Sequence, residues 1–177
     1  LWVWWNEDGK KNQEGNYRSG QQHGTWINYN EKGRKIEESQ WKNGELFGKT
    51  TLWDKNGNKT ILKSFKEDEK DGLWIWWSPN GKKVKEGNFK LGDKNGKWTY
   101  YHANGKKKRL ENYKLGKKNG KLIVWFENGQ KEREESYKND EKHGKWTYWF
   151  ENGRLDKEEK YTNGVQTDGK HYDYFDN

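Results

Sequence analysis

The chain alternates between short runs of strand-forming residues and polar turns, and this alternation repeats every 24 residues. A first glycine position recurs at this period, at Gly24, Gly48, Gly72, Gly96, Gly120 and Gly144, and at Gly169 after one extra residue. A second comprises Gly9, Gly33, Gly57, Gly81, Gly105, Gly129 and Gly153, and a third comprises Gly20, Gly44, Gly92, Gly116 and Gly164, with Asp68 and Asp140 at its missing sites. A period of this length indicates a repeat array.

Each repeat predicts one β-hairpin, because its two turn sequences are separated by runs rich in Trp, Tyr, Thr and Ile. An Asn precedes the second glycine in most repeats, as in Asn56-Gly57, and Asn-Gly favours a two-residue type I′ turn with positive φ at both residues. The third glycine lies in segments such as Lys42-Asn43-Gly44-Glu45, for which we expect a slightly longer connection.

The turn position also predicts which residues pair. If Lys32-Gly33 is a two-residue turn, paired positions sum to 65 and Trp41 lies opposite Gly24. The same rule places Tyr113 opposite Gly96 and Tyr161 opposite Gly144. We expect each ring to cover the bare backbone of its glycine, which would explain both positions.

Aromatic residues form two further rows. One lies five places after the first glycine, at Trp5, Tyr29, Trp53, Trp77, Tyr101, Trp125, Trp149 and Tyr174. The other lies seven places before it, at Tyr17, Trp41, Phe65, Phe89, Tyr113 and Tyr137, and Tyr161 continues it. Because side chains alternate along a strand, we expect an all-β, elongated, single-layer antiparallel meander with aromatic rows on both faces. About fourteen strands would span roughly 70 Å.

The composition supports a folded chain of one domain. Charged residues make up 36% of the 177 residues and mean hydropathy is −1.64, but 13 Trp and 10 Tyr argue against disorder. We expect residues 1–177 to form a single repeat domain of about seven hairpins. Its first repeat is incomplete, so we expect residues before Leu1, or another chain, to cover that edge. Residues 165–177, with His171 and Asp173 departing from the pattern, form the predicted C-terminal cap.

The sequence gives no support for catalysis or for a cofactor. It contains no G-x-S-x-G, P-loop, H-E-x-x-H or G-x-G-x-x-G motif and no Cys. His23 and His143 are interpreted as solvated turn residues, the periodic glutamates as the polar side of a strand, and Glu67–Gly72 as a charged turn. No stretch approaches the ~20 apolar residues of a membrane span. No signal peptide is visible, so the compartment stays undetermined.

Basic residues concentrate in one part of the chain. Residues 82–121 hold 14 Lys or Arg and 3 Asp or Glu. This basic belt is densest at Lys106, Lys107, Lys108, Arg109, Lys114, Lys117 and Lys118. It is interpreted either as protection of exposed sheet edges against aggregation or as a docking patch for an acidic partner. Nucleic acid is disfavoured, because the belt is local and the rest of the chain is neutral or acidic.

The second and fourth places after the first glycine supply candidate binding rings. They vary between repeats, so they are free to specialise, and a single-layer sheet has no second layer to cover them. We therefore expect partly exposed rings that bind a partner, or rings that only stack sideways on one another. The candidates are Trp26, Trp74, Trp76, Trp98, Tyr100, Trp146 and Tyr148.

The repeat Tyr-Lys-Asn-Gly-x-x-x-Gly-Lys-Trp-x-Tyr-x-x-x-Asn-Gly resembles the bacterial variant of the MORN repeat (membrane occupation and recognition nexus) over nearly all of the chain. The resemblance implies a single-layer twisted sheet of consecutive hairpins. It also implies an interaction scaffold, often labelled antitoxin-like or immunity-like in bacteria. Asp68 and Asp140 depart from the pattern, since turn glycines are expected there.

These observations together predict a non-enzymatic scaffold that binds another protein through the candidate rings and the basic belt. The alternative hypothesis is a cell-envelope module that binds a glycan, an anionic polymer or a lipid surface through stacked aromatic rings and the basic belt. A stoichiometric protein partner would favour the first hypothesis, and retention on cell-wall polysaccharide would favour the second.

Overall fold

The computed structural model describes residues 1–173. The chain forms two compact units, Leu1–Asp93 (unit 1) and Lys94–Asn177 (unit 2). All regular elements within the described residues are β-strands. The prediction of an all-β fold is therefore confirmed.

Unit 1 contains β1 (Trp2–Trp5), β2 (Lys11–Arg18), β3 (Gln21–Tyr29), β4 (Lys35–Lys42), β5 (Glu45–Trp53), β6 (Lys59–Lys66), β7 (Glu69–Lys70), β8 (Gly72–Trp77) and β9 (Lys83–Lys90). The strands of unit 2 are β10 (Asp93–Tyr101, which begins at the last residue of unit 1), β11 (Lys107–Lys114), β12 (Lys117–Lys118), β13 (Gly120–Trp125), β14 (Lys131–Lys138), β15 (Glu141–Lys142), β16 (Gly144–Trp149), β17 (Leu155–Thr162) and β18 (Val165–His171).

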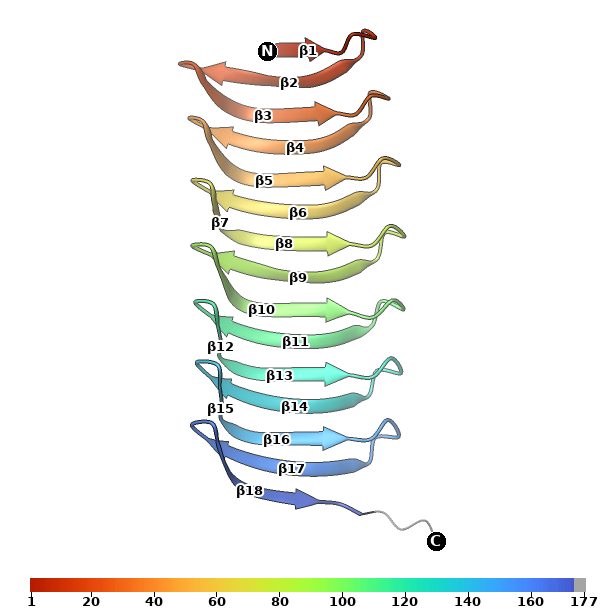
Figure 1. Ribbon diagram of the computed structural model, residues 1–177, viewed down its shortest axis with the longest axis vertical. Helices are drawn as coiled ribbons and strands as arrows, with labels where there is room; N and C mark the ends of the chain where they lie inside the picture. Colours follow the sequence, from red (N-terminus) through yellow and green to blue (C-terminus); the bar gives the residue numbers. More distant parts are fainter. Residues whose placement is uncertain (174–177) are drawn as a thin grey trace. The chain divides into compact units, whose positions relative to one another are not determined.

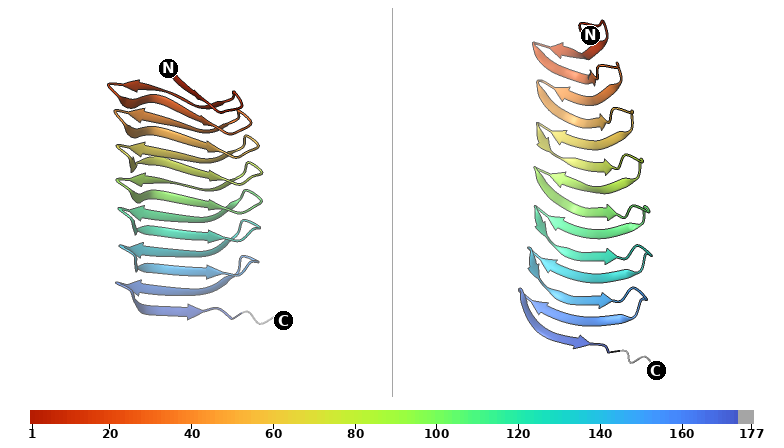
Figure 2. Two further views of the ribbon diagram at one scale, coloured as in Figure 1. Left: turned by 45° about the horizontal axis from the view of Figure 1, so that its top comes forward. Right: turned by 45° about the vertical axis from the view of Figure 1, so that its right-hand side comes forward.

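Within each unit the strands follow one another as an antiparallel meander (Figure 1). The short strands β7, β12 and β15 each share a partner with the strand that follows them, as when β11 pairs with both β12 and β13. The longer strands are visibly bowed in both units (Figure 2). Each repeat is therefore one hairpin, as the sequence predicts.

The predicted register is confirmed where it was worked out. Gly24 pairs with Trp41, Gly96 with Tyr113 and Gly144 with Tyr161. Close to the turn, however, the register shifts by one residue between Asn28 and Tyr29. A β-bulge at this place lets a longer turn give the same register along the rest of the hairpin.

The two kinds of turn are the reverse of what the sequence predicts. At the third glycine position, Lys42 pairs directly with Glu45, and Asn43 and Gly44 both have positive φ, of 51° and 83°. This is the two-residue type I′ turn. At the second position, the Gly57 amide donates to the Asp54 carbonyl, and the Asp54 amide donates to the Asn58 carbonyl. The Asn-Gly turn is thus the longer one, with a left-handed glycine at its end.

The Asn of Asn-Gly is used for its side chain rather than for a left-handed backbone. The Asn104 Oδ1 accepts a hydrogen bond from the Lys106 amide at 2.9 Å, and the Asn128 Oδ1 accepts one from the Gln130 amide at 2.8 Å. Asn and Asp commonly stabilise turns in this way, by bonding to the backbone two residues ahead. A local rule for Asn-Gly therefore identified the turn but not its type.

The first glycine position is explained by backbone conformation. Gly24 and Gly96 have φ of 76° and 72°, and a side chain at either would meet no atom within 4 Å. Left-handed φ favours glycine whatever space is available. The predicted ring contact is therefore not needed to explain these glycines.

Some predictions about the ends of the chain stay untested. Tyr174 and the last residues of the predicted cap, 174–177, lie outside the described residues. Within the described part of the cap, β18 pairs with β17 and its residues are all exposed. The prediction of a single domain over residues 1–177 stays a prediction.

Candidate binding surfaces

The four candidate tryptophans at the second place are buried, so the predicted partial exposure is wrong for them, whereas Trp2, at the same place in the incomplete first repeat, is 60% exposed. Trp98 is 1% exposed, Trp26 2%, Trp146 3% and Trp74 7%. They lie on one face of the hairpins, here called the core face, together with the aromatic row that begins at Tyr17. The opposite face, which carries the row beginning at Trp5, is called the outer face.

The burial arises because each indole lies across the preceding hairpin, between two rings of the aromatic row. The Trp74 ring is 5.4 Å from that of Phe65 and 5.1 Å from that of Phe89, between ring centroids. Its Nε1 donates to the Ser64 carbonyl at 3.0 Å. Trp146 repeats this arrangement between Tyr137 and Tyr161. The sideways stacking considered from the sequence thus accounts for these rings.

Lysines complete the cover of the core face. The Lys142 Nζ lies 4.3 Å from the Trp146 ring centroid and 4.5 Å from that of Tyr161. Lys94, 48 residues earlier, has equivalent contacts with the rings of Trp98 and Tyr113, at 4.5 and 4.7 Å. An ammonium group over an aromatic face is attracted by the ring quadrupole, and its stem shields the ring from water. A single layer of strands therefore buries its tryptophans without a second layer.

The three candidate rings at the fourth place are half-buried, and each has a cation on it. Lys85 lies 4.3 Å from the Trp76 centroid. The Arg109 guanidinium carbon lies 4.3 Å from the Tyr100 centroid, and Lys157 lies 4.4 Å from that of Tyr148. These are the candidate rings that a partner could still reach, once the cation is displaced.

Unit 2 has a buried acidic position between its rings. Glu111 and Glu135 are 3% and 6% exposed. The Tyr113 hydroxyl donates to Glu111 at 3.0 Å, and the Tyr137 hydroxyl donates to Glu135 at 2.9 Å. Burial, followed by the nearby carboxylate, raises the pKa of both phenols. The phenols therefore stay protonated and hold the carboxylates in place.

Glu159 continues this position. Its carboxylate accepts hydrogen bonds from the Tyr161 hydroxyl at 3.1 Å and the Lys157 ammonium at 2.9 Å. Burial acts to raise the pKa of Glu159, but the bonds from Lys157 and Tyr161 outweigh it and the pKa is lowered. The carboxylate is thus charged at neutral pH, and its hydrogen bonds to Tyr161 and Lys157 have a structural role.

The basic belt does not form a continuous patch in unit 2. Lys106, Lys107 and Lys108 are exposed at one end of β11, and Lys117 is exposed beyond the other end. Eight residues of strand separate the two groups by roughly 25 Å. Arg109 and Lys118 are used on the core face, where Lys118 lies 5.0 Å from the Tyr137 centroid.

Two leucines at turn tips form a feature that the sequence analysis missed. Leu91 in unit 1 and Leu115 in unit 2 occupy the first position of a type I′ turn, with φ of 49° and 48°. Leu91 is 64% exposed and Leu115 is 57% exposed. The left-handed region is unfavourable for a bulky side chain, and Asn occurs at the same position in Asn43, Asn139 and Asn163. The sequence does indicate these unusual turn tips, because Leu-Gly stands where other repeats have Asn-Gly.

The missing turn glycines are compensated by their replacements. The Asp68 carboxylate accepts a hydrogen bond from the Leu46 amide at 2.7 Å, and the Asp140 carboxylate accepts one from the Lys118 amide at 2.7 Å. Each aspartate thus ties its turn to the neighbouring hairpin. These substitutions are structural features of the turn edge, and they offset the strain of φ values of 62° and 72°.

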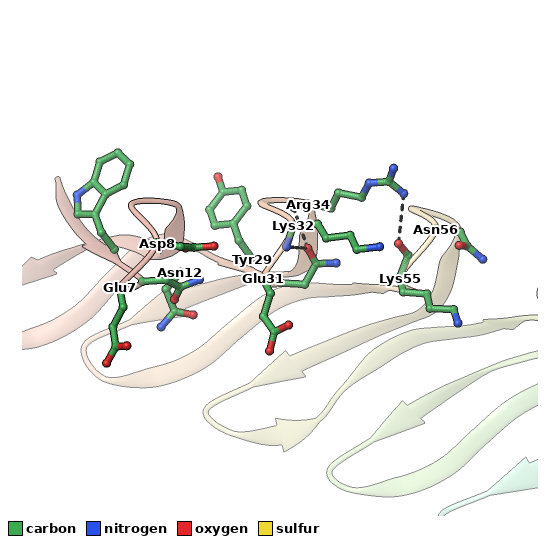
Figure 3. Close-up of a pocket in the computed structure, with 12 residues that line it drawn as sticks. Glu7, Asp8, Asn12, Tyr29, Glu31, Lys32, Arg34, Lys55 and Asn56 are labelled. Carbon is green, nitrogen blue, oxygen red and sulfur yellow. Dashed lines mark hydrogen bonds between the residues drawn. The ribbon is translucent and has the colours of Figure 1, made fainter.

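Unit 1 also has an open groove beside its longer turns, with a volume of about 1220 Å³. Figure 3 shows Tyr29 rising between the turn that carries Asp8 and the turn that carries Lys32. Arg34 reaches towards the next turn, where its Nη1 donates to the Lys55 carbonyl at 3.3 Å. The groove is lined by Trp5, Asn6, Glu7, Asp8, Asn12, Tyr29, Asn30, Glu31, Lys32, Arg34, Lys55 and Asn56.

Other chemistry is not assembled in residues 1–173. No group of three or more His, Cys, Asp or Glu side chains in that range could hold a metal ion. The Nδ1 atoms of His23 and His143 are buried and have no hydrogen-bond partner, so these histidines are less solvated than predicted. No helix in the described part of the chain is long and apolar enough to cross a membrane.

Comparison with known proteins places this geometry in a family. A family model described as a MORN repeat variant matches residues 70–91, 94–115, 118–139 and 142–163. No curated protein matches the sequence. Among solved structures, one described as "Crystal structure of GtfA/B complex bound to UDP and GlcNAc" is 12% identical, with a TM-score of 0.28. The match covers 62% of this chain and 21% of that one, and such a score carries no argument about fold or function.

MORN repeats are generally associated with binding to proteins or membrane lipids, and the family is a repeat scaffold rather than an enzyme family. The core-face rings, the two turn types and the 24-residue period all recur through the matched segments. The chain therefore contains four tandem repeats that belong to the MORN repeat variant family.

Proposed function

We infer that the chain is a non-enzymatic scaffold that binds another protein, in an antitoxin-like or immunity-like role. The antitoxin-like role rests on the family resemblance. The protein partner is supported by one observation, the exposed leucine at a left-handed turn position. Leu115 has φ of 48° and is 57% exposed, so its backbone strain is not offset by burial in this chain. Contact with a partner would offset it.

The surroundings of Leu115 indicate the chemistry of the partner. Lys114 and Lys117 flank the turn and are exposed, and the Leu115 amide is within 3.5 Å of the Asn95 Oδ1. The turn is therefore bonded to the preceding strand β10, while the Leu115 side chain is exposed between two cations. We expect an apolar pocket rimmed by carboxylates on the partner.

The alternative function, glycan or anionic-polymer binding on the core-face rings, has less support. The second-place tryptophans that it requires are buried between neighbouring rings, and lysines cover several of them. The basic belt is divided between two ends of β11. Neither feature offers a continuous row of rings to a polymer.

The test compares two substitutions at equivalent turn positions of unit 2. Leu115→Asn relieves left-handed strain and should raise the free energy of unfolding by about 1 kcal/mol. Asn163→Leu introduces the same strain and should lower it by a similar amount. Asn163 has φ of 48° and lies at the first position of its turn, so it is a matched control.

Binding is measured by crosslinking the tagged chain in extracts of its source cell and by weighing the purified complex. We expect a stoichiometric protein partner whose affinity falls at least tenfold with Leu115→Asn and is unchanged with Asn163→Leu. Recovery of no stoichiometric partner would contradict the scaffold function. A partner bound equally well by Leu115→Asn would remove the leucine from the interface.

A further inference from the structure

The groove of unit 1 lies on the outer face and uses none of the candidate rings discussed above. Its lining combines two aromatic rings, four asparagines, three carboxylates and three cationic side chains. We propose that this groove is a binding site for a neutral, β-1,4-linked oligosaccharide of glucose-type sugars, spanning at least two sugar rings.

The spacing of the two rings sets the length of the ligand. Trp5 ends β1 and Tyr29 ends β3, and both follow residues that pair with Gln13 of the intervening strand. The two rings therefore share a face and are aligned two strands apart, roughly 10 Å. An extended β-1,4-linked chain advances by a similar distance over two sugar rings, so alternate sugars can each meet one aromatic ring.

Both rings suit stacking against a sugar. Trp5 is 59% exposed, so its face is accessible. Tyr29 is held in one orientation, because its hydroxyl donates to the Glu14 Oε1 at 2.5 Å and the Glu14 Oε2 pairs with Lys11 at 2.8 Å. A ring that is already fixed loses little entropy on binding. Glucose-type sugars, whose hydroxyls are equatorial, present C–H groups on both ring faces to such rings.

The polar lining carries both signs of charge. Glu7, Asp8 and Glu31 are balanced in number by Lys32, Arg34 and Lys55. Figure 3 shows Glu7 and Glu31 pointing to the side of the strands opposite to Tyr29, whereas Lys32 and Arg34 extend alongside it. The ring side of the groove therefore presents Lys32 and Arg34 beside Asp8, and these side chains can donate to, or accept from, sugar hydroxyls.

The amides provide the complementary hydrogen bonds. Asn6, Asn12, Asn30 and Asn56 line the groove. An amide side chain can both donate and accept, as a sugar hydroxyl does. The Asn30 Oδ1 already accepts from the Lys32 and Arg34 amides, so Asn30 offers its N–H groups. A polyhydroxylated ligand without net charge is therefore the class that matches rings and amides together.

The experiment titrates the ¹⁵N-labelled chain with cellohexaose and, separately, with chitohexaose, and follows the backbone amide signals of residues in the groove by NMR, together with the Trp5 indole N–H where it is present. We expect saturable binding of at least one of them with Kd below about 1 mM. Trp5→Ala should weaken this binding about tenfold, the value of one ring contact. Tyr29→Phe retains the ring and should change the affinity by less than about threefold, whereas Tyr29→Ala should weaken it about tenfold.

Trp149→Ala is the matched control, because Trp149 occupies the same position of the repeat in unit 2 and does not line the groove. It should leave Kd unchanged within about twofold. Thermal melts of all variants separate lost binding from lost folding, and Trp5, being exposed, provides a variant that we expect to fold. Three results would each overturn the proposal: binding of neither hexasaccharide at millimolar concentration, equal loss with Trp149→Ala, or tighter binding of a galacturonic acid hexamer.

Discussion

The two units differ at one position of the core face. The residue directly opposite the second place after the first glycine differs between them. In unit 1 it is Gly15, Ser39, Lys63 or Gly87, and in unit 2 it is Glu111, Glu135 or Glu159. One repeat pattern thus stabilises its core face by two different means.

In unit 1, small residues leave room for an indole. The Trp26 ring lies so close to Gly15 that a Cβ there would be 2.3 Å from the ring carbon Cδ2. The Trp26 Nε1 donates to the Asn16 carbonyl at 3.1 Å. The ring is therefore stabilised by close packing on bare backbone, and any side chain at position 15 would displace it.

In unit 2, carboxylates bond to phenols beside the rings. Glu135 accepts from the Tyr137 hydroxyl at 2.9 Å and pairs with the Arg133 Nε at 3.0 Å. A buried carboxylate is unfavourable unless it is fully bonded. The core face of unit 2 should therefore depend on the protonation of its tyrosines, whereas that of unit 1 should depend mainly on fit. In unit 1, burial and Glu14 raise the pKa of Tyr29 to about 12, but this ring lies on the outer face.

The largest expected effect is that alkaline pH destabilises unit 2 more than unit 1. Burial and neighbouring carboxylates raise the pKa of Tyr113, Tyr137 and Tyr148 in unit 2. Unfolded tyrosine ionises near pH 10, so the stabilisation from these phenols is complete below about pH 10 and is lost as pH rises through their folded-state pKa values. We expect unit 2 to unfold cooperatively in this range, measured as phenolate absorbance at 295 nm together with circular dichroism.

A triple variant tests whether these phenols are responsible. Tyr113→Phe, Tyr137→Phe and Tyr148→Phe together should reduce the number of protons released on alkaline unfolding by about three. Tyr17→Phe is the control in unit 1, since Tyr17 is 42% exposed, and it should leave the alkaline midpoint unchanged. Gradual ionisation of the wild type from pH 10, without loss of structure, would contradict the dependence on buried phenols.

A smaller effect is expected from a pair of double-mutant cycles at equivalent positions. In unit 2 the Tyr113 hydroxyl donates to Glu111 at 3.0 Å, and in unit 1 the Trp41 Nε1 donates to the Ser39 Oγ at 2.8 Å. A hydrogen bond to a charged acceptor is about twice as strong as a neutral one. We expect coupling free energies of about 2 kcal/mol for Glu111→Ala with Tyr113→Phe, and about 1 kcal/mol for Ser39→Ala with Trp41→Phe.

Urea unfolding of the seven proteins in the two cycles, with the wild type common to both, provides the measurement. Because repeat arrays can unfold in stages, hydrogen exchange assigns each loss to its unit. If the coupling in unit 1 equals or exceeds that in unit 2, the carboxylate is not what distinguishes the two core faces.

These residues also show how much of the fold and of the candidate binding surfaces could be predicted from the sequence. Glycine periodicity and strand alternation predicted the hairpins and the Gly24–Trp41 register, because both depend on local backbone geometry. The burial of Trp98 was missed because it depends on lysine and tyrosine side chains of neighbouring hairpins, such as Lys94 and Tyr113. The type of the Asn-Gly turn was missed because side-chain capping competed with the left-handed preference of Asn.

The smallest expected effect comes from ion pairs on the outer face, where both units have a lysine paired with the glutamate three residues ahead. Lys35 pairs with Glu38 at 2.6 Å in unit 1, and Lys131 pairs with Glu134 at 2.6 Å in unit 2. Exposed pairs contribute little, because water screens the charges and two long side chains lose freedom. Lys35→Ala and Lys131→Ala should each lower the free energy of unfolding by less than about 1 kcal/mol, measured by urea unfolding. Glu134 also pairs with Lys121, which stays in place in Lys131→Ala, so the loss in unit 2 should be the smaller of the two. A larger loss in unit 2 would contradict this.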